Sequence, residues 1–471
     1  MKIAFVGAGS LGFTRRLMAD ILSVPEFRDT EFRFMDIDKD RLEKVAAVCR
    51  KTIKLNRLGA TVTTSAQRKR ALEGSDCVFC VARVGGLKAF EKDIRIPLKY
   101  GVDQCVGDTL CVGGIFYAMR TIPVILGICE DMRAVCPDAM LINHTNPMAM
   151  NSWAAYKHGG VRYVGLCHGV EEGARRIAKA LKIPPKELDF VCAGINHQSW
   201  YIKVSHKGKD MLPRLLDAFL ADPDLSKQEP VRIEVMRRFG YFSTESNGHL
   251  SEYVPWFRKR KKELARWIGP GSWIHGETGG YLRDCRETAD YFEKYWKQFL
   301  KGEVPSGELG PRSGEHGSHI IEAIETGRPY RGHFNVWNDG VITNLPGCVV
   351  EGPCYVDRHG IQPLRIGALP AQCAALIRNS INVQALAVEA AVTGNRDLVK
   401  QAVALDPLCG AVLNLEEVWA MCDEMFDALA PWLPQFRKRK ARSRVEKAVS
   451  RIRQDESAAV STALRSPGEP E

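Results

Sequence analysis

The sequence predicts an α/β protein in two parts, a doubly wound parallel sheet followed by a mixed α+β domain. Three observations support this prediction. The chain opens with an apolar strand, a glycine-rich turn and a helix. Strands and helices then alternate to about residue 165, which is typical of a parallel sheet. The second half mixes helical stretches with strands and turns, and 471 residues are too many for one small core.

The N-terminal segment carries the pattern of a dinucleotide-binding turn. Residues 2–6 form a short apolar run, typical of a buried strand, and the letters GAGSLG follow it. Gly7 allows the tight turn, Gly9 lets the backbone approach a pyrophosphate, and Gly12 allows close packing of the helix. The helix N-terminus offers free N–H groups to the phosphates. We therefore expect a Rossmann-like domain that binds NAD, and its expected contacts in this turn are Gly7, Gly9, Ser10 and Leu11.

Asp36 ends the next predicted strand, 24 residues after Gly12. An acid at about this distance accepts hydrogen bonds from the ribose of the cofactor. Because it would repel a 2′-phosphate, it favours NAD over NADP. The alternative is a glycine turn in another kind of α/β protein, but the strand, the helix and the acid together favour the nucleotide.

Polar side chains that follow the predicted strands are the candidates for the active site. In parallel sheets, ligands bind beyond the carboxyl ends of the strands. We expect strands at 78–84, 139–143 and 163–166, and helices at 116–132 and 171–181. Asn143 ends one of these strands and is a further expected cofactor contact.

The second half is expected to be helical at 210–240, 284–300 and 368–433, with strands within 333–358. The sequence shows no internal repeat and no long linker. We place the NAD-binding domain at 1–195 and a domain for substrate, metal and oligomerisation at 196–436. Residues 437–471 are expected to form a basic, partly disordered tail.

Composition indicates a globular protein without a membrane or secretory segment. The apolar share is 45% and the charged share 26%, as in soluble proteins. A strand begins at once, without a signal sequence, and no apolar run approaches the ~20 residues of a membrane helix. The 15 cysteines are scattered through expected core strands and helices, and their odd number argues against a complete disulfide framework, which indicates mostly reduced thiols. We expect a cytoplasmic protein with no membrane partner.

The net charge of +10 is concentrated near the C-terminus, where residues 437–453 hold nine Lys or Arg and one acid. Without the +8 of this segment, the rest of the chain has a net charge of +2. Such a run can bind nucleic acid, but it is more often a solvated helix face or a frayed end. We expect no nucleic-acid partner.

Cys167 and His197 are the candidate metal ligands. Each follows a predicted strand, and both should emerge near the expected nicotinamide. A thiolate and an imidazole bind divalent transition ions and leave positions open for substrate. The alternative is a pair of ordinary core residues, and the position at strand ends favours the metal site.

Two further segments carry candidate substrate and acid–base residues. Asn146 lies before a proline and Asp108 before a double glycine, so each could begin a helix or contact sugar hydroxyls. Residues 240–253 are dense in acid–base side chains. We expect a general base in this stretch, with Glu245 as the candidate, and a substrate contact at His249.

Together these motifs resemble glycoside hydrolase family 4, the NAD- and metal-dependent glycosidases. The resemblance runs from residue 1 to about 436. It rests on GAGS at 7, DTLCVGG at 108, NPMAMN at 146, CHGV at 167, GINH at 194, NDGVITNLP at 338 and GIQPLRIGALP at 360. Within the family these motifs are most similar to those of the α-galactosidase (melibiase) branch.

The resemblance implies a redox-assisted elimination. Bound NAD oxidises C3 of the sugar, a base removes the C2 proton, the C1 substituent leaves, water adds and the hydride returns. It also implies Mn²⁺ held by Cys167 and His197, and a substrate contact at Asn146. His168, directly after the metal cysteine, is a candidate acid or sugar contact. Relatives carry Tyr or Asp as the base where this chain has Glu245, so Tyr241 and Tyr253 stay open as alternatives.

The implied substrate is a small α-glycoside, with an α-galactoside favoured. The motif CHGV is also similar to the corresponding motif of relatives that act on α-glucuronides or α-galacturonides, so these substrates are alternatives. An α-glucosidase of this family is a further alternative. Outside the family, the open alternatives are an NAD-dependent 2-hydroxy acid or sugar dehydrogenase of lactate/malate dehydrogenase-like fold and a non-catalytic dinucleotide sensor. Relatives suggest a homodimer or homotetramer.

Overall fold

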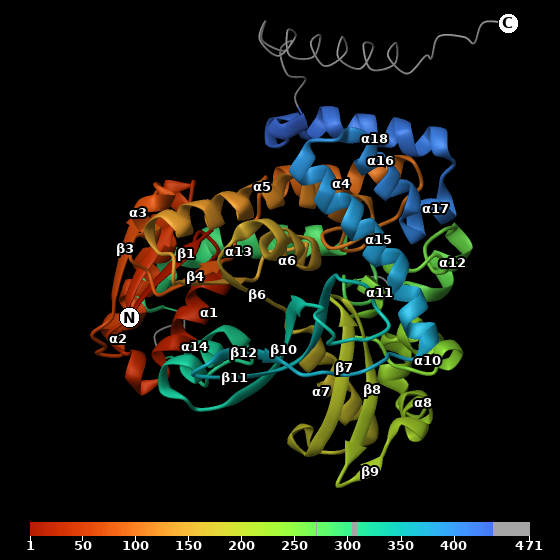
Figure 1. The fold of residues 1–471 in the computed structure, drawn as a ribbon, viewed down its shortest axis with the longest axis horizontal. Helices are drawn as coiled ribbons and strands as arrows, with labels where there is room; N and C mark the ends of the chain where they lie inside the picture. Colours follow the sequence, from red (N-terminus) through yellow and green to blue (C-terminus); the bar gives the residue numbers. More distant parts are fainter. Residues whose placement is uncertain (270, 304–308, 437–471) are drawn as a thin grey trace, which may run out of the picture.

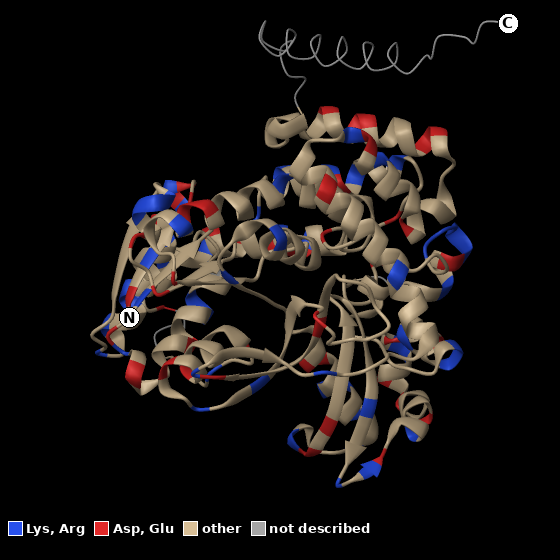
Figure 2. Cartoon of the chain, viewed as in Figure 1, with Lys and Arg blue, Asp and Glu red and all other residues tan. Residues whose placement is uncertain are grey.

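The computed structural model describes residues 1–269, 271–303 and 309–436. The predicted basic tail at 437–471 lies outside them. Over the described elements, Figure 2 shows Lys and Arg interspersed with Asp and Glu.

The first half forms a parallel sheet in the order β3-β2-β1-β4-β5-β6 (Figure 1). Its strands are β1 (Lys2–Val6), β2 (Glu31–Met35), β3 (Thr61–Ser65), β4 (Cys77–Cys80), β5 (Met140–Asn143) and β6 (Arg162–Leu166). This order is that of doubly wound nucleotide-binding sheets, and it confirms the predicted fold class.

Helices cover both faces of this sheet. They are α1 (Leu11–Leu22), α2 (Lys39–Leu55), α3 (Arg68–Leu72), α4 (Gly86–Lys99), α5 (Cys111–Val135), α6 (Met148–Ala154) and α7 (Gly169–Leu181). Ile3 and Phe5 of β1 pack into one hydrophobic cluster, and Ala4 and Val6 pack into another. Because both faces of β1 are buried from Ile3 onward, its residues 3–6 are all apolar rather than alternating.

The sheet continues into the second half, where its strands run antiparallel. Strand β10 pairs with β6, and β11, β7, β8 and β9 follow in that order, with β12 on β11. Their bounds are β7 (Leu188–Ile195), β8 (Gln198–His206), β9 (Lys209–Asp210), β10 (Tyr330–Trp337), β11 (Val349–Asp357) and β12 (Gly360–Pro363). The hairpin of β7 and β8, which the sequence analysis did not predict, has its turn at the proposed domain boundary.

Most of the remaining helices lie in stretches expected to be helical, but α11, α12 and α14 lie outside those stretches. They are α8 (Leu212–Ala221), α9 (Pro223–Gln228), α10 (Pro230–Phe239), α11 (Asn247–Tyr253), α12 (Lys261–Trp267), α13 (Gly280–Lys301), α14 (His316–Thr326), α15 (Ala371–Thr393), α16 (Arg396–Leu405), α17 (Pro407–Val412) and α18 (Leu415–Leu429). Helices α4, α15, α16 and α18 pack into a layer beside α5 (Figure 1).

Helix α5 corrects one expectation from the sequence. Its 25 residues are long and apolar enough to cross a membrane, so the statement that no apolar run approaches that length was wrong. The reason for its composition is burial, because 78% of its most apolar segment lies inside the protein, against α3, α4, α6 and α15. A helix that is apolar all round is typical of a protein core as well as of a membrane.

Candidate active site

The glycine turn packs closely against the residues that follow β2 and β4. Gly7 has a φ of 88°, and a Cβ there would lie 2.5 Å from the backbone of Ala82, so only glycine fits. The Gly9 N–H donates to Asp36 Oδ2 over 2.9 Å. A Cβ on Gly9 would lie 2.8 Å from the same oxygen. The structure therefore brings Asp36 directly against the turn.

The third glycine does not have its expected role. A Cβ on Gly12 would meet no described atom within 4 Å, so the prediction that Gly12 allows close helix packing was wrong. Helix α1 packs instead through Leu17, Met18 and Ile21 on its other face. Ser10 is the N-cap of α1, without a side-chain cap bond, and Leu11 is the first residue of the helix.

The polar residues after β5 are joined to the entry of α5. Asn143 forms the turn itself, because its amide donates to Thr145 O over 3.0 Å and accepts from Thr145 N over 3.1 Å. Asn146 reaches outward, and its Nδ2 donates to Asp108 Oδ1 over 3.2 Å. Arg83 Nη2, from the end of β4, lies 3.4 Å from Asp108 Oδ2. Asp108 and Asn146, both predicted substrate contacts, thus lie together.

A short relay connects this pair to His197. The Thr109 hydroxyl donates to Asp108 Oδ1 over 2.9 Å and lies 3.0 Å from His197 Nδ1. His197 occupies the turn between β7 and β8 with a φ of 64°. The antiparallel hairpin therefore carries the imidazole back to the ends of the parallel strands.

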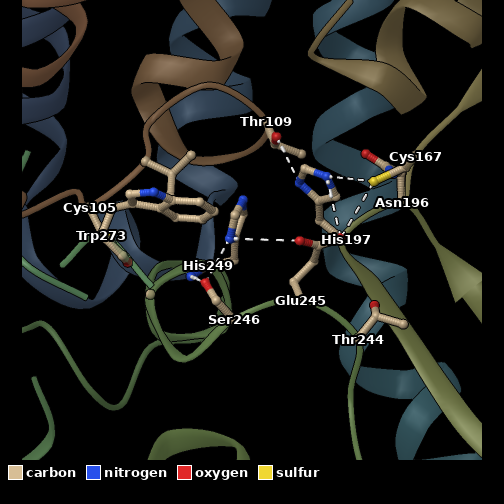
Figure 3. A network of polar contacts seen from close by, with 12 residues as sticks. Cys105, Thr109, Cys167, Asn196, His197, Thr244, Glu245, Ser246, His249 and Trp273 are labelled. Carbon is tan, nitrogen blue, oxygen red and sulfur yellow. Dashed lines mark hydrogen bonds and ion pairs between the residues drawn. The ribbon is translucent and has the colours of Figure 1, made fainter. Parts of the chain in front are cut away.

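Cys167, His197 and Glu245 form a compact cluster (Figure 3). Cys167 Sγ lies 3.2 Å from His197 Nε2 and 3.5 Å from Glu245 Oε1. His197 Nε2 lies 3.6 Å from Glu245 Oε1. The structure brings together the two predicted metal ligands and the predicted base. A thiolate, an imidazole and a carboxylate are donors that suit a divalent transition ion.

A second group of similar composition has a different role. Cys111, Asp406 and Cys409 are buried between α5 and α17, with the two sulfurs 3.8 Å apart. The Asp406 carboxylate already accepts the backbone N–H groups of Cys111, Leu408 and Cys409. It therefore caps helix α17 and joins it to α5.

The electrostatics of the Cys167 cluster favour a cation. Burial, and then the carboxylates of Glu245 and Glu351, raise the pKa of the Cys167 thiol well above its usual range. Burial opposes ionisation of Glu245, and the imidazoles of His197, His249 and His168 lower its pKa when they carry a positive charge. A bound cation would stabilise the carboxylate and convert the thiol to a thiolate.

His249 lies beside the cluster as a neutral imidazole. Its Nδ1 is 2.9 Å from Ser246 Oγ and 3.9 Å from Glu245 Oε2, and its ring meets the His197 ring edge-on (Figure 3). Burial lowers the pKa of His249 to about 4. The ring can therefore accept or donate a hydrogen bond at neutral pH without carrying charge.

The alternative bases lie in less suitable places than Glu245. The Tyr253 hydroxyl is 3.5 Å from His197 Nδ1, the ring nitrogen turned away from Cys167. Tyr241 is half-buried and packs against the main hydrophobic core. His168 follows Cys167 directly, but its side chain is 59% exposed and its Nδ1 lies 3.6 Å from Glu315.

The sequence did not predict the buried Glu351, whose hydrogen bonds hold the residues on either side of His197 in the β7–β8 turn. Glu351 in β11 accepts from Asn196 Nδ2 and Ser199 Oγ, each over 3.1 Å. Burial, and then the charge of Glu245, raise the pKa of Glu351 to about 8. The available signal was a single glutamate within an apolar strand, in the letters CVVEGPCYV.

Known families match this chain along nearly all of its described length. A family model described as "Family 4 glycosyl hydrolase" matches residues 2–183. A second, described as "Family 4 glycosyl hydrolase C-terminal domain", matches residues 192–409.

Individual relatives and solved structures are consistent with these two family matches. An alpha-galactosidase of Rhizobium meliloti is 53% identical over 92% of this chain and 89% of its own length. An alpha-galactosidase of Bacillus subtilis is 37% identical over 93% of this chain and 100% of its own length. The crystal structure of a putative glucosidase from Bacillus subtilis superposes with a TM-score of 0.78 at 25% identity, covering 90% of this chain and 99% of that one. The chain therefore belongs to family 4 of the glycosyl hydrolases, as the motifs indicated.

Proposed function

We propose that this enzyme is an NAD- and divalent metal-dependent α-galactosidase that works by redox-assisted elimination. The observation that carries the proposal is the cluster of Cys167, His197 and Glu245, joined through Thr109 and Asp108 to Asn146. The names of the relatives at 53% and 37% identity support the α-galactoside. Alpha-galacturonidases and an alpha-glucosidase of the family are 26–29% identical.

The proposed cofactors are NAD and Mn²⁺. Solved relatives of similar fold hold these groups, including a 6-phospho-alpha-glucosidase from gut microorganisms in complex with NAD and Mn²⁺. In this chain Gly7, Gly9 and Asp36 would hold NAD, which supplies a reversible hydride acceptor for C3 of the sugar. Cys167 and His197 would hold the metal, which supplies Lewis-acid polarisation of the sugar oxygens.

The side chains have distinct proposed roles in the reaction. The Asp108–Asn146 pair presents a carboxylate and an amide that orient the sugar hydroxyls, and His249 adds a neutral partner. Glu245 accepts the C2 proton, because its carboxylate lies beside Cys167 and His197, the side chains that would hold the metal against the sugar. His168, exposed beside Cys167, is placed to protonate the leaving oxygen when the bond at C1 breaks. Water then adds at C1 and gives one proton back to His168, Glu245 returns its proton to C2, and C3 regains the hydride.

The experiment that tests this function is a panel of aryl α- and β-glycosides of galactose, glucose, glucuronic acid and galacturonic acid. Each is assayed with NAD, Mn²⁺ and a reductant. We expect cleavage of the α-galactoside without accumulation of NADH, and incorporation of deuterium at C2 in heavy water. Preference for an α-uronide would change the substrate, and net NADH formation without cleavage would favour a dehydrogenase.

We further propose a cytoplasmic location and a homodimer or homotetramer. All 15 cysteines are free thiols, which supports a reducing compartment, and a thiol ligand would be sensitive to oxidation. Light scattering after size-exclusion chromatography would give the oligomeric state.

The proposed domains are 1–195 and 196–436. The two family matches, which meet between residues 183 and 192, support a division near this point, although one sheet crosses it.

A further inference from the structure

Gly169 leaves a space that the carboxylate of Glu245 fills. Gly169 is the first residue of α7, two positions after Cys167. A Cβ there would lie 1.5 Å from Glu245 Oε1 and 2.5 Å from its Cδ. The backbone of Gly169 is not in the left-handed region, so alanine would fit the chain locally. Among the described residues, the three atoms nearest to that Cβ all belong to the Glu245 carboxylate.

The protein holds Glu245 in this position at a cost. Its φ of 67° is unusual for a residue with a side chain and costs about 1 kcal/mol or more. The flanking segment is fixed, since Thr244 N donates to Ser199 O over 2.8 Å and Ser199 N donates to Thr244 Oγ1 over 3.1 Å. Ser246 then caps α11. Strain that is over-determined by its surroundings is typical of functional positions.

The surroundings of Glu245 Oε1 are those of a ligand atom. Its described partners are the thiol of Cys167 at 3.5 Å and the imidazole of His197 at 3.6 Å. The carboxylate is almost fully buried, and its ion pairs among the described residues are with histidines, not with Lys or Arg. A buried carboxylate requires positive charge beside it, and a metal ion between Cys167 and His197 would supply that charge.

We propose that Glu245 is a third protein ligand of the metal, through Oε1, and that Gly169 is the residue that makes room for it. The inference rests on the proposed metal-dependent function. Glu245 Oε2 points the other way, toward His249 at 3.9 Å, so the base role proposed above uses the second oxygen. Gly169 is then a positioning residue that acts through Glu245.

The test is the Mn²⁺ affinity of the NAD-loaded protein, measured from the electron paramagnetic resonance signal of free Mn²⁺. We compare wild type with Glu245→Gln, Gly169→Ala and the double variant. Each single change should weaken binding by at least about tenfold, the lower end of the range seen when groups behind metal ligands are lost. The double variant should be no weaker than the weaker single variant, because both changes remove the same contact.

Gly59→Ala is the matched control, since a Cβ there meets only ordinary contacts near Asp29, and it should bind Mn²⁺ as wild type does. Melting temperature and NAD affinity verify that each variant is folded. Wild-type affinity in Glu245→Gln, with loss in Cys167→Ser, would overturn the third ligand and leave the proposed function standing. Wild-type affinity in Gly169→Ala alone would overturn the role of Gly169. Failure of the wild type itself to bind Mn²⁺ would instead contradict the proposed function.

Discussion

The hydroxyl of Thr109 lies 3.0 Å from Nδ1 of His197, so the other ring nitrogen, Nε2, is the one that faces Cys167. Because the hydroxyl proton is directed to Asp108 Oδ1 at 2.9 Å, Thr109 accepts from Nδ1–H. In the neutral ring, a proton on Nδ1 leaves Nε2 with its lone pair, which faces Cys167. The entry of α5 thus selects the tautomer of a residue in the β7–β8 turn.

Thr109→Val should therefore weaken the metal site while leaving the ligands in place. Valine has a similar shape but cannot accept from His197, so Mn²⁺ affinity or turnover should fall about 10- to 100-fold. Thr109→Ser keeps the hydroxyl and should stay within about threefold of wild type. Equal behaviour of the two variants, measured by Mn²⁺ binding and α-galactoside cleavage, would contradict the tautomer argument.

Cys167→Ser should abolish metal-dependent turnover and leave NAD binding intact. A serine hydroxyl is a poor replacement for a thiolate toward a transition ion, whereas the NAD turn lies on other strands. Turnover is measured with and without added Mn²⁺, and NAD binding by fluorescence. Cys136→Ala, a buried cysteine remote from the cluster, serves as the control and should keep both properties. Undiminished activity of Cys167→Ser in metal-free buffer would disprove the metal assignment.

Metal binding should release a proton from Cys167. Burial and the nearby carboxylates raise the pKa of this thiol, so the metal-free protein holds the proton at neutral pH. A metal takes the thiolate, so the affinity should rise about tenfold per pH unit below that pKa. Titration calorimetry in two buffers of different ionisation enthalpy should show release of about one proton at pH 7. A Cys167→Ser protein should release none, and a binding enthalpy that does not change with buffer would contradict the prediction.

The parts of the site that the sequence predicted are those set by local chain geometry. Gly7 and Asp36 belong to one strand–turn–helix–strand unit, and Cys167 follows a strand end, so the rule for ligands in parallel sheets was enough to find them. The contact of Gly169 with Glu245 joins segments 76 residues apart and has no local signal. The prediction for Gly12 was wrong because the face through which α1 packs depends on the rest of the fold.

Asp36→Ala should lower the affinity for NAD and reduce the preference of the protein for NAD over NADP. The Asp36 carboxylate lies on the glycine turn and would accept from the ribose, and a hydrogen bond to a charged group contributes about 1.5–3 kcal/mol. The affinity for NAD should therefore fall about 10- to 100-fold, while the affinity for NADP should change less. The matched control is Asp38→Ala, which removes the same charge from the cap of α2. Equal losses for both variants would show that Asp36 acts only through overall charge.

Glu252 should make the stability of the protein depend on pH in an unusual direction. Its buried carboxylate accepts the backbone N–H groups of Cys105, Val106 and Gly107, the loop that leads to Asp108. Burial raises its pKa from 4.5 to about 7, although Arg258 and these N–H groups lower it in part.

Between these two pH values the folded protein binds a proton that the unfolded chain has released. The contribution of this group to stability is therefore fully present below pH 4.5 and is lost as the pH rises through 7. Glu252→Gln cannot titrate. The free energy of unfolding of wild type, relative to that variant, should thus fall by about 3 kcal/mol between pH 4.5 and 8. Urea unfolding followed by tryptophan fluorescence at several pH values measures this difference. A difference that stays constant or grows with pH would show that the carboxylate is already ionised in its loop, held by the three N–H groups and Arg258.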